Sequence, residues 1–106
     1  MNSWFILSIS ILFEIAGTTA MKLSEGFTKL WPSVSMMVFY LLSLVMFNFA
    51  LKKIELSIAY AVWGGVGTAA IALIGLLAFH EEVTALKLLS LALVISGVVG
   101  LHISSR

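Results

Sequence analysis

Four stretches of apolar residues, separated by short polar segments, dominate this sequence. A helix needs roughly 20 mostly apolar residues to cross a bilayer, with a range of about 17–25. The stretches predict helices at about residues 4–21, 34–51, 57–79 and 86–103. Of the 106 residues, 61% are hydrophobic and 10% are charged, whereas about a quarter of a soluble domain is charged. We therefore expect an all-α membrane protein of four transmembrane helices, in one domain over residues 1–106.

The rest of the composition excludes several classes of function. The net charge of +1 does not suggest nucleic-acid binding, and without cysteine there is no thiolate chemistry. The sequence has no phosphate-binding glycine loop and no nucleophile–base arrangement, so we expect neither an enzyme nor a cofactor. The N-terminal stretch lacks the basic region and the cleavage site of a signal peptide, and we expect it to remain as a span.

Basic residues, which orient membrane proteins, are divided evenly between the two sides of the bilayer. Because the connections are short, neighbouring helices run antiparallel and the charged ends alternate. One side holds Lys22, Lys29 and Lys87, and the other holds Lys52, Lys53 and Arg106. Such a balance can arise by chance, but it favours a chain that inserts in both orientations and pairs as an antiparallel dimer.

Glu14 lies near the middle of the first predicted span. A charged carboxylate at this depth costs at least about 2.5 kcal/mol, so it is a functional candidate by default. A structural pairing with Lys22 is the alternative, but eight residues of helix separate the two by about 12 Å. A buried carboxylate can hold a proton or a cationic ligand, and each disfavours the other. Glu14 is therefore the predicted proton and substrate site.

Small and polar residues accompany Glu14 on the first two spans. Thr18, one turn after Glu14, can hydrogen-bond the carboxylate, and Gly17 lets another helix or a ligand approach. Tyr40 and Ser43 share one face of the second span and can line the same cavity. Packing between helices is the alternative role for each of them.

The third span places two aromatic residues in mid-membrane. Tyr60 and Trp63 share one helical face with Gly64 and Gly67. Aromatic faces attract organic cations, so both rings are candidates for substrate binding, with packing in the bundle as the alternative. The glycines at positions 64, 65 and 67 weaken the helix, and such a place can bend.

The end of the third span and the fourth span complete the set of candidates. We interpret His80, Glu81 and Glu82 as solvated charges and expect no metal site. Small residues among leucine and valine mark close helix contacts in lipid. The fourth span carries such a stripe, which predicts a dimerisation helix: Ser90, Gly97 and Gly100.

Taken together, the motifs resemble the small multidrug resistance family of proton-coupled exporters along the whole chain. In the first half they are Glu14 with Gly17-Thr18-Thr19, Met21-Lys22, Ser24-Glu25-Gly26-Phe27-Thr28 and Trp31-Pro32-Ser33. In the third span they are Ala59-Tyr60-Ala61-Val62-Trp63 and Gly65-Val66-Gly67. The set is specific as a whole, although no motif would be so alone.

The resemblance implies an antiparallel, dual-topology dimer in a bacterial inner or plasma membrane. Glu14 of both subunits would bind protons or substrate at a shared site, and alternating access would exchange them. The substrate pocket would be formed by Tyr60, Trp63, Tyr40, Ser43, Thr18 and the aromatic position 4, here Trp4. The resemblance further implies a helix kink at Gly65 and Gly67 and a dimer held by the fourth span.

The subtype indicated is a homodimeric multidrug exporter of quaternary ammonium and other hydrophobic cations. Guanidinium exporters of this superfamily carry a tryptophan shortly after the carboxylate, where this chain has Gly17-Thr18-Thr19. The pair Trp63-Gly64 instead resembles one partner of the paired spermidine exporters, so a heterodimeric polyamine or guanidinyl exporter stays open. A membrane protein that only assembles with a partner is a further alternative.

Overall fold

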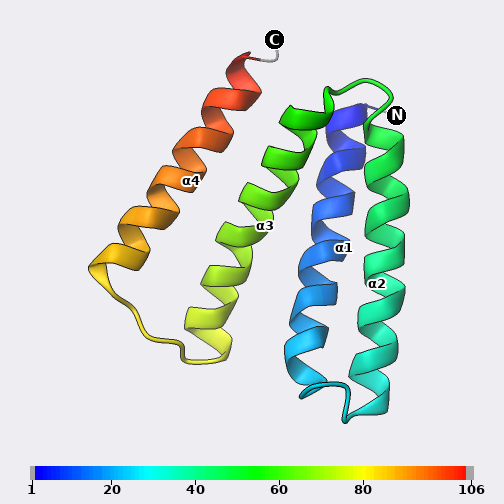
Figure 1. Cartoon of the computed structure of the whole chain (residues 1–106), viewed down its shortest axis with the longest axis vertical. Helices are drawn as coiled ribbons and strands as arrows, with labels where there is room; N and C mark the ends of the chain where they lie inside the picture. Colours follow the sequence, from blue (N-terminus) through cyan, green and yellow to red (C-terminus); the bar gives the residue numbers. More distant parts are fainter. Residues whose placement is uncertain (1, 105–106) are drawn as a thin grey trace.

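The computed structural model describes residues 2–104 and places them in four α-helices without any strand (Figure 1). The helices are α1 (Ser3–Leu23), α2 (Leu30–Ala50), α3 (Leu56–Ala78) and α4 (Ala85–Ser104). All four are long and apolar enough to cross a membrane. The predicted fold class, an all-α protein of four transmembrane helices, is confirmed.

Helix α2 begins four residues earlier than the sequence predicts, at Leu30 in place of residue 34. Pro32, which we expected in the preceding loop, lies in the first turn of α2. Proline is tolerated there because the amide groups of a first helical turn have no acceptor within the helix. The first loop is therefore short, and it turns through three consecutive positive-φ residues, Glu25, Gly26 and Phe27.

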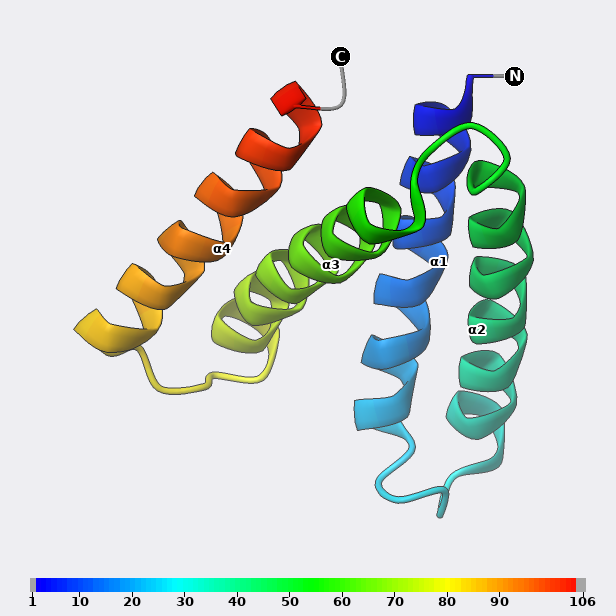
Figure 2. The same cartoon turned by 45° about the horizontal axis from the view of Figure 1, so that its top comes forward.

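The four helices form a flat assembly of 43 × 35 × 17 Å. Helices α1 and α2 lie side by side, α3 packs against α1, and α4 packs against α3 at the outer edge (Figures 1 and 2). Helix α1 begins and α4 ends at the same end of the molecule, and the connections alternate between the ends (Figure 1). Since a helix with its side chains is about 10–12 Å across, the smallest dimension leaves little room for a second layer.

Small and hydroxylated residues hold α1 against α2. Ser10 and Ser43 are fully buried, and each hydroxyl donates to the other residue's backbone carbonyl at 2.7 Å. Gly17 lies against Tyr40, where an added Cβ would be 3.3 Å from the ring. In lipid such close contacts and cross-helix hydrogen bonds replace the hydrophobic effect as the force between helices.

The apolar core lies toward the end at which α1 begins and α3 starts. It joins α1, the end of α2 with the following turn, and the first half of α3 through Leu7, Ile11, Ala50, Ile54, Ala59 and Val62. No residue of α4 is buried, so this helix adds nothing to the buried core. The polar site described below lies farther along α1, beyond this core.

Candidate functional site

Glu14 is half-buried on α1, and one of its two carboxylate oxygens is held by a chain of hydroxyl groups. Oε1 accepts a hydrogen bond of 2.9 Å from Thr18 Oγ1, and Thr18 Oγ1 is in turn hydrogen-bonded to the Tyr40 hydroxyl. The threonine hydroxyl has a single hydrogen, so while it donates to Glu14 the tyrosine must donate to it. These two hydrogen bonds, from Tyr40 to Thr18 and from Thr18 to Glu14, orient the Glu14 carboxylate as a hydrogen-bond acceptor.

The second oxygen of Glu14, Oε2, is buried and has no hydrogen-bond partner among the described residues. It lies against Gly67 of α3, where an added Cβ would be only 2.7 Å away. The missing side chain at Gly67 therefore leaves the space that Oε2 occupies. Buried polar atoms are nearly always paired, and an exception calls for an explanation. A proton or a cationic ligand at Oε2 would supply the missing partner.

A cavity of about 390 Å³ between α1 and α3 opens onto Glu14. Residues of both helices and two charged residues from the chain after α3 line it. The lining residues are Glu14, Thr18, Trp63, Gly64, Gly67, Thr68, Ile71, Ala72, Glu81 and Lys87. Within residues 2–104 the ion pairs are Glu25–Lys29 and Glu81–Lys87, so no lysine or arginine neutralises Glu14. The cavity can hold an organic cation against a carboxylate.

The two aromatic candidates of α3 are in contact with each other, but only one of them lines this cavity. Trp63 faces the cavity, and its indole N–H donates to the Ser43 hydroxyl at 3.3 Å. Tyr60 lies 5.8 Å from Trp63 between ring centroids and is 60% exposed, outside the cavity wall. Phe47 of α2 contacts both rings, at 5.3 Å from Trp63 and 6.4 Å from Tyr60. The chain thus presents an aromatic cluster beside the carboxylate.

Three further residues predicted to bind substrate, Tyr40, Ser43 and Trp4, do not line the cavity in this chain, and Tyr40 is joined to it only through its hydrogen bond to Thr18. Ser43 is fully buried between α1 and α2, and it reaches the cavity only through its hydrogen bond to Trp63. Trp4 lies near the start of α1, where its ring meets His102 of α4 edge-on at 4.5 Å. Ten residues of helix separate Trp4 from Glu14, about 15 Å along the axis. Contact of Trp4 with a substrate stays a prediction.

The predicted kink and the predicted dimer stripe also have defined surroundings. Helix α3 is continuous through Gly65 and Gly67, and Gly65 lies so close to Val98 of α4 that an added Cβ would force the valine side chain to shift. Gly97 and Gly100 have nothing within 4 Å of an added Cβ in the described chain, and Ser90 is exposed. Kinking and dimerisation at these residues stay predictions, and Arg106, part of the charge balance, lies outside the described residues.

Glu81 is a site residue that the sequence analysis does not predict. The sequence indicates a solvated charge, whereas the structure places Glu81 at the cavity. It lines the cavity of Glu14 and pairs with Lys87 at 3.6 Å. No periodic pattern indicates this placement, which depends on how the chain reverses after α3. The reversal includes His80, whose φ of 54° is unusual for a residue other than glycine.

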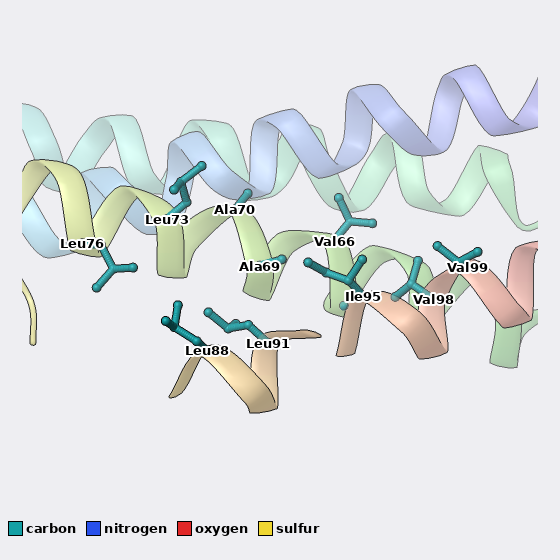
Figure 3. Close-up of a pocket in the computed structure, with 11 residues that line it drawn as sticks. Val66, Ala69, Ala70, Leu73, Leu76, Leu88, Leu91, Ile95, Val98 and Val99 are labelled. Atoms are coloured by element: carbon teal, nitrogen blue, oxygen red, sulfur yellow. The ribbon is translucent and has the colours of Figure 1, made fainter. Parts of the chain in front are cut away.

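A second hollow, of about 550 Å³ between α3 and α4, has a different character (Figure 3). Its lining side chains, among them Leu73, Leu88, Ile95 and Val99, are all apolar. Figure 3 shows these side chains along both helices, with only carbon atoms among them. This hollow suits hydrocarbon, and it offers nothing that would bind a proton or a charge.

The fold and the site define a multi-pass helical membrane protein with a half-buried carboxylate in a cavity that a tryptophan also lines. The model of the Small Multidrug Resistance protein family matches residues 2–94. The chain therefore belongs to the small multidrug resistance family, and it is a multi-pass protein of the bacterial inner membrane. The predicted family and localisation are confirmed.

Individual relatives carry different names. The chain is 48% identical over 101 residues to the uncharacterized membrane protein YvaE of Bacillus subtilis, covering 95% of this chain and 85% of the relative. It is 44% identical over 102 residues to the multidrug resistance protein EbrB of Bacillus subtilis, covering 96% and 87%. It is 36% identical over 103 residues to the guanidinium exporter of Proteus vulgaris, covering 97% and 99%.

Proposed function

We propose that this protein is a proton-coupled antiporter that exports hydrophobic and quaternary ammonium cations, with protons and substrate competing for Glu14. The observation that carries the proposal is that Glu14 lines a cavity together with Trp63 while its Oε2 has no hydrogen-bond partner among the described residues. Such an export function agrees with the name of the relative EbrB, a multidrug resistance protein.

Competition at one carboxylate is sufficient to couple the two fluxes. An ionised Glu14 attracts a cation, and the face of Trp63 adds a cation–π contact, worth about 2 kcal/mol or more where water is excluded. Protonation removes the negative charge and so favours release of the cation. If the carrier switches between its inward-facing and outward-facing states only when a proton or a cation is bound, it exchanges one for the other across the membrane.

A dimer completes the site in this proposal. A flat chain of 43 × 35 × 17 Å cannot surround a solute, and the cavity at Glu14 has walls from α1 and α3 only, apart from Glu81 and Lys87. A second copy in the opposite orientation would supply a facing wall and a second Glu14. The even division of Lys and Arg between the two sides supports a dual-topology homodimer. The exposed stripe of Ser90, Gly97 and Gly100 on α4 is its proposed contact.

Guanidinyl compounds are the second candidate substrates, since one relative is named a guanidinium exporter. Polyamines are a third class of candidate substrate, exported by a paired heterodimer. The pair Trp63-Gly64, which resembles one partner of the spermidine exporters, lines the cavity. The apolar floor formed by Ile71 and Ala72 favours the bulky hydrophobic cation over either. A protein that only assembles with a partner would not need Glu14.

Uptake into proteoliposomes tests the proposal. With an acidic lumen, vesicles holding the wild type should accumulate tetraphenylphosphonium and alkalinise the lumen, whereas Glu14→Gln should do neither. Glu25→Gln is the matched control, because Glu25 is an exposed carboxylate on the first loop, and it should transport normally. Transport of guanidinium or spermidine in place of tetraphenylphosphonium would select an alternative substrate. Proton-driven uptake by Glu14→Gln would refute the proposal.

A further inference from the structure

Two carboxylates, Glu14 and Glu81, line the same cavity, and each lies against a glycine of α3. Glu14 Oε2 occupies the space beside Gly67, and Glu81 Oε1 occupies the space beside Gly75. An added Cβ at either glycine would come closer than 3.0 Å to the carboxylate. Because eight residues separate the two glycines, the carboxylates are about 12 Å apart along the axis of α3.

The chain after α3 is folded so that Glu81 comes back over the helix end. His80 turns the backbone with a φ of 54°, and the Glu81 amide donates to the Gly75 carbonyl at 3.0 Å. A non-glycine residue in this conformation is uncommon and has to be held there by its surroundings. The result places the Glu81 side chain between α3 and the start of α4, at the end of the cavity.

Lys87 holds Glu81 in the described chain. The two charged atoms lie 3.6 Å apart, and the side chains are 46% exposed for Glu81 and 32% exposed for Lys87. The same Nζ of Lys87 also donates a hydrogen bond of 3.1 Å to the Glu82 backbone carbonyl. An ion pair this exposed is weak, worth about 1 kcal/mol or less. A cation that approaches Glu81 can therefore replace Lys87 at little cost.

The cavity adjoins a neighbouring hollow toward the end of the molecule where α1 ends. This neighbouring hollow, of about 360 Å³, shares Thr18, Ile71 and Glu81 with the cavity and extends to Lys22 and Phe79. Lys22 lies 6.0 Å from the centre of the Phe79 ring at this end. Each hollow thus has one lysine in its lining, Lys22 in the neighbouring hollow and Lys87 in the cavity, and Glu81 is the carboxylate that both share.

We propose that Glu81 is an outer binding group for the exported cation, which displaces Lys87 there on its way to or from Glu14. The inference rests on the proposed function, since it assumes that an organic cation uses this cavity. Glu81 lowers the electrostatic barrier on a path that Lys22 and Lys87 would otherwise make repulsive. It acts on the rates of entry and exit, while Glu14 sets the affinity.

Stopped-flow binding of tetraphenylphosphonium to the purified protein in detergent, at alkaline pH, tests this role. Glu81→Gln should slow association and release alike, each about three- to fivefold, and leave Kd within about twofold because a site on the path is not part of the end state. Lys87→Gln frees Glu81 and should speed both processes. Unchanged affinity in both variants also shows that they are folded.

Glu82→Gln is the matched control, because it removes the same charge from the neighbouring residue, which does not line the cavity. High salt screens exposed charges beyond a few ångströms, so it should abolish any effect of Glu82→Gln and should only reduce that of Glu81→Gln, which acts by direct contact with the cation. Equal rates for the two variants at high salt would overturn the outer site. So would rate changes of the same sign in Glu81→Gln and Lys87→Gln. If wild type and Glu14→Gln bind alike, the proposed function itself fails.

Discussion

Helix α1 buries five of its residues within the chain, whereas α4, which is almost as long, buries none. Both are apolar enough to cross a membrane, so hydropathy does not separate them. They differ in where small and polar groups lie: α1 turns Ser10, Glu14 and Gly17 toward other helices, and α4 leaves Gly97 and Gly100 open. In lipid, small and polar residues decide which helices pack closely. The position of α1 is therefore set within one chain, and α4 keeps its small residues open for the second copy that we propose.

Introducing the same side chain on both helices is the strongest test of this contrast. Gly17→Leu would place a large group where even a Cβ lies 3.3 Å from Tyr40, so it should separate α1 from α2 and destabilise the folded chain by about 1–3 kcal/mol. Gly97→Leu meets open space in the described chain and should leave its fold intact. Thermal unfolding in detergent compares the two, and equal destabilisation would contradict the contrast.

A smaller but more specific effect is expected at Gly67. Gly67→Ala adds a Cβ 2.7 Å from Glu14 Oε2, and the flexible carboxylate can move aside without unfolding the chain. We expect normal thermal stability and about a tenfold loss of tetraphenylphosphonium affinity, or about 1.4 kcal/mol. Gly64→Ala is the control, because nothing lies within 4 Å of its added Cβ. Equal affinity in the two variants would show that the Gly67 contact is unimportant.

For α4, the effect should be on assembly alone. Gly97→Leu is expected to weaken the dimer, since a large side chain would hold two closely packed helices apart. Ala92→Leu, at another exposed position of α4, should not. Energy transfer between singly labelled chains in detergent measures the dimer fraction. If both variants dimerise like the wild type, the small-residue stripe is not the contact.

The smallest effect is expected from the hydroxyl chain. Tyr40→Phe removes the hydroxyl that hydrogen-bonds Thr18, and Thr18 in turn hydrogen-bonds Glu14. Losing one such hydrogen bond costs about 1 kcal/mol, so we expect cation affinity to fall about fivefold. Tyr60→Phe removes a hydroxyl that makes no hydrogen bond within residues 2–104 and should have less effect. Isothermal titration calorimetry of both variants would show whether the loss is specific to Tyr40.

The sequence predicted the helices and the central residue well because lipid imposes strong constraints on both. Apolar stretches of spanning length define the helices, and a lone mid-membrane carboxylate such as Glu14 stands out by its cost. The sequence does not predict the early start of α2, because proline is typical of loops as well as of a first helical turn, where Pro32 lies.

The pairing of residues from different helices was harder to predict. Sequence periodicity predicts which residues share a helical face, but not which helix packs against that face. The contacts of Gly67 with Glu14 and of Gly65 with Val98 are therefore seen only in the structure. Glu81 was missed for a stronger reason, because its position depends on a single backbone reversal at His80 that no composition signal marks. Trp4 was assigned to substrate on resemblance alone, and within one chain it contacts His102.

Proton release on cation binding tests the central claim most directly. Tetraphenylphosphonium is added to the purified protein in weakly buffered detergent solution, and the pH change and the heat of binding are recorded at several starting pH values. Competition at Glu14 predicts that the wild type releases protons and binds more weakly as the pH falls, and that Glu14→Gln releases none. Tight binding that is independent of pH, or equal proton release by Glu14→Gln, would contradict the account.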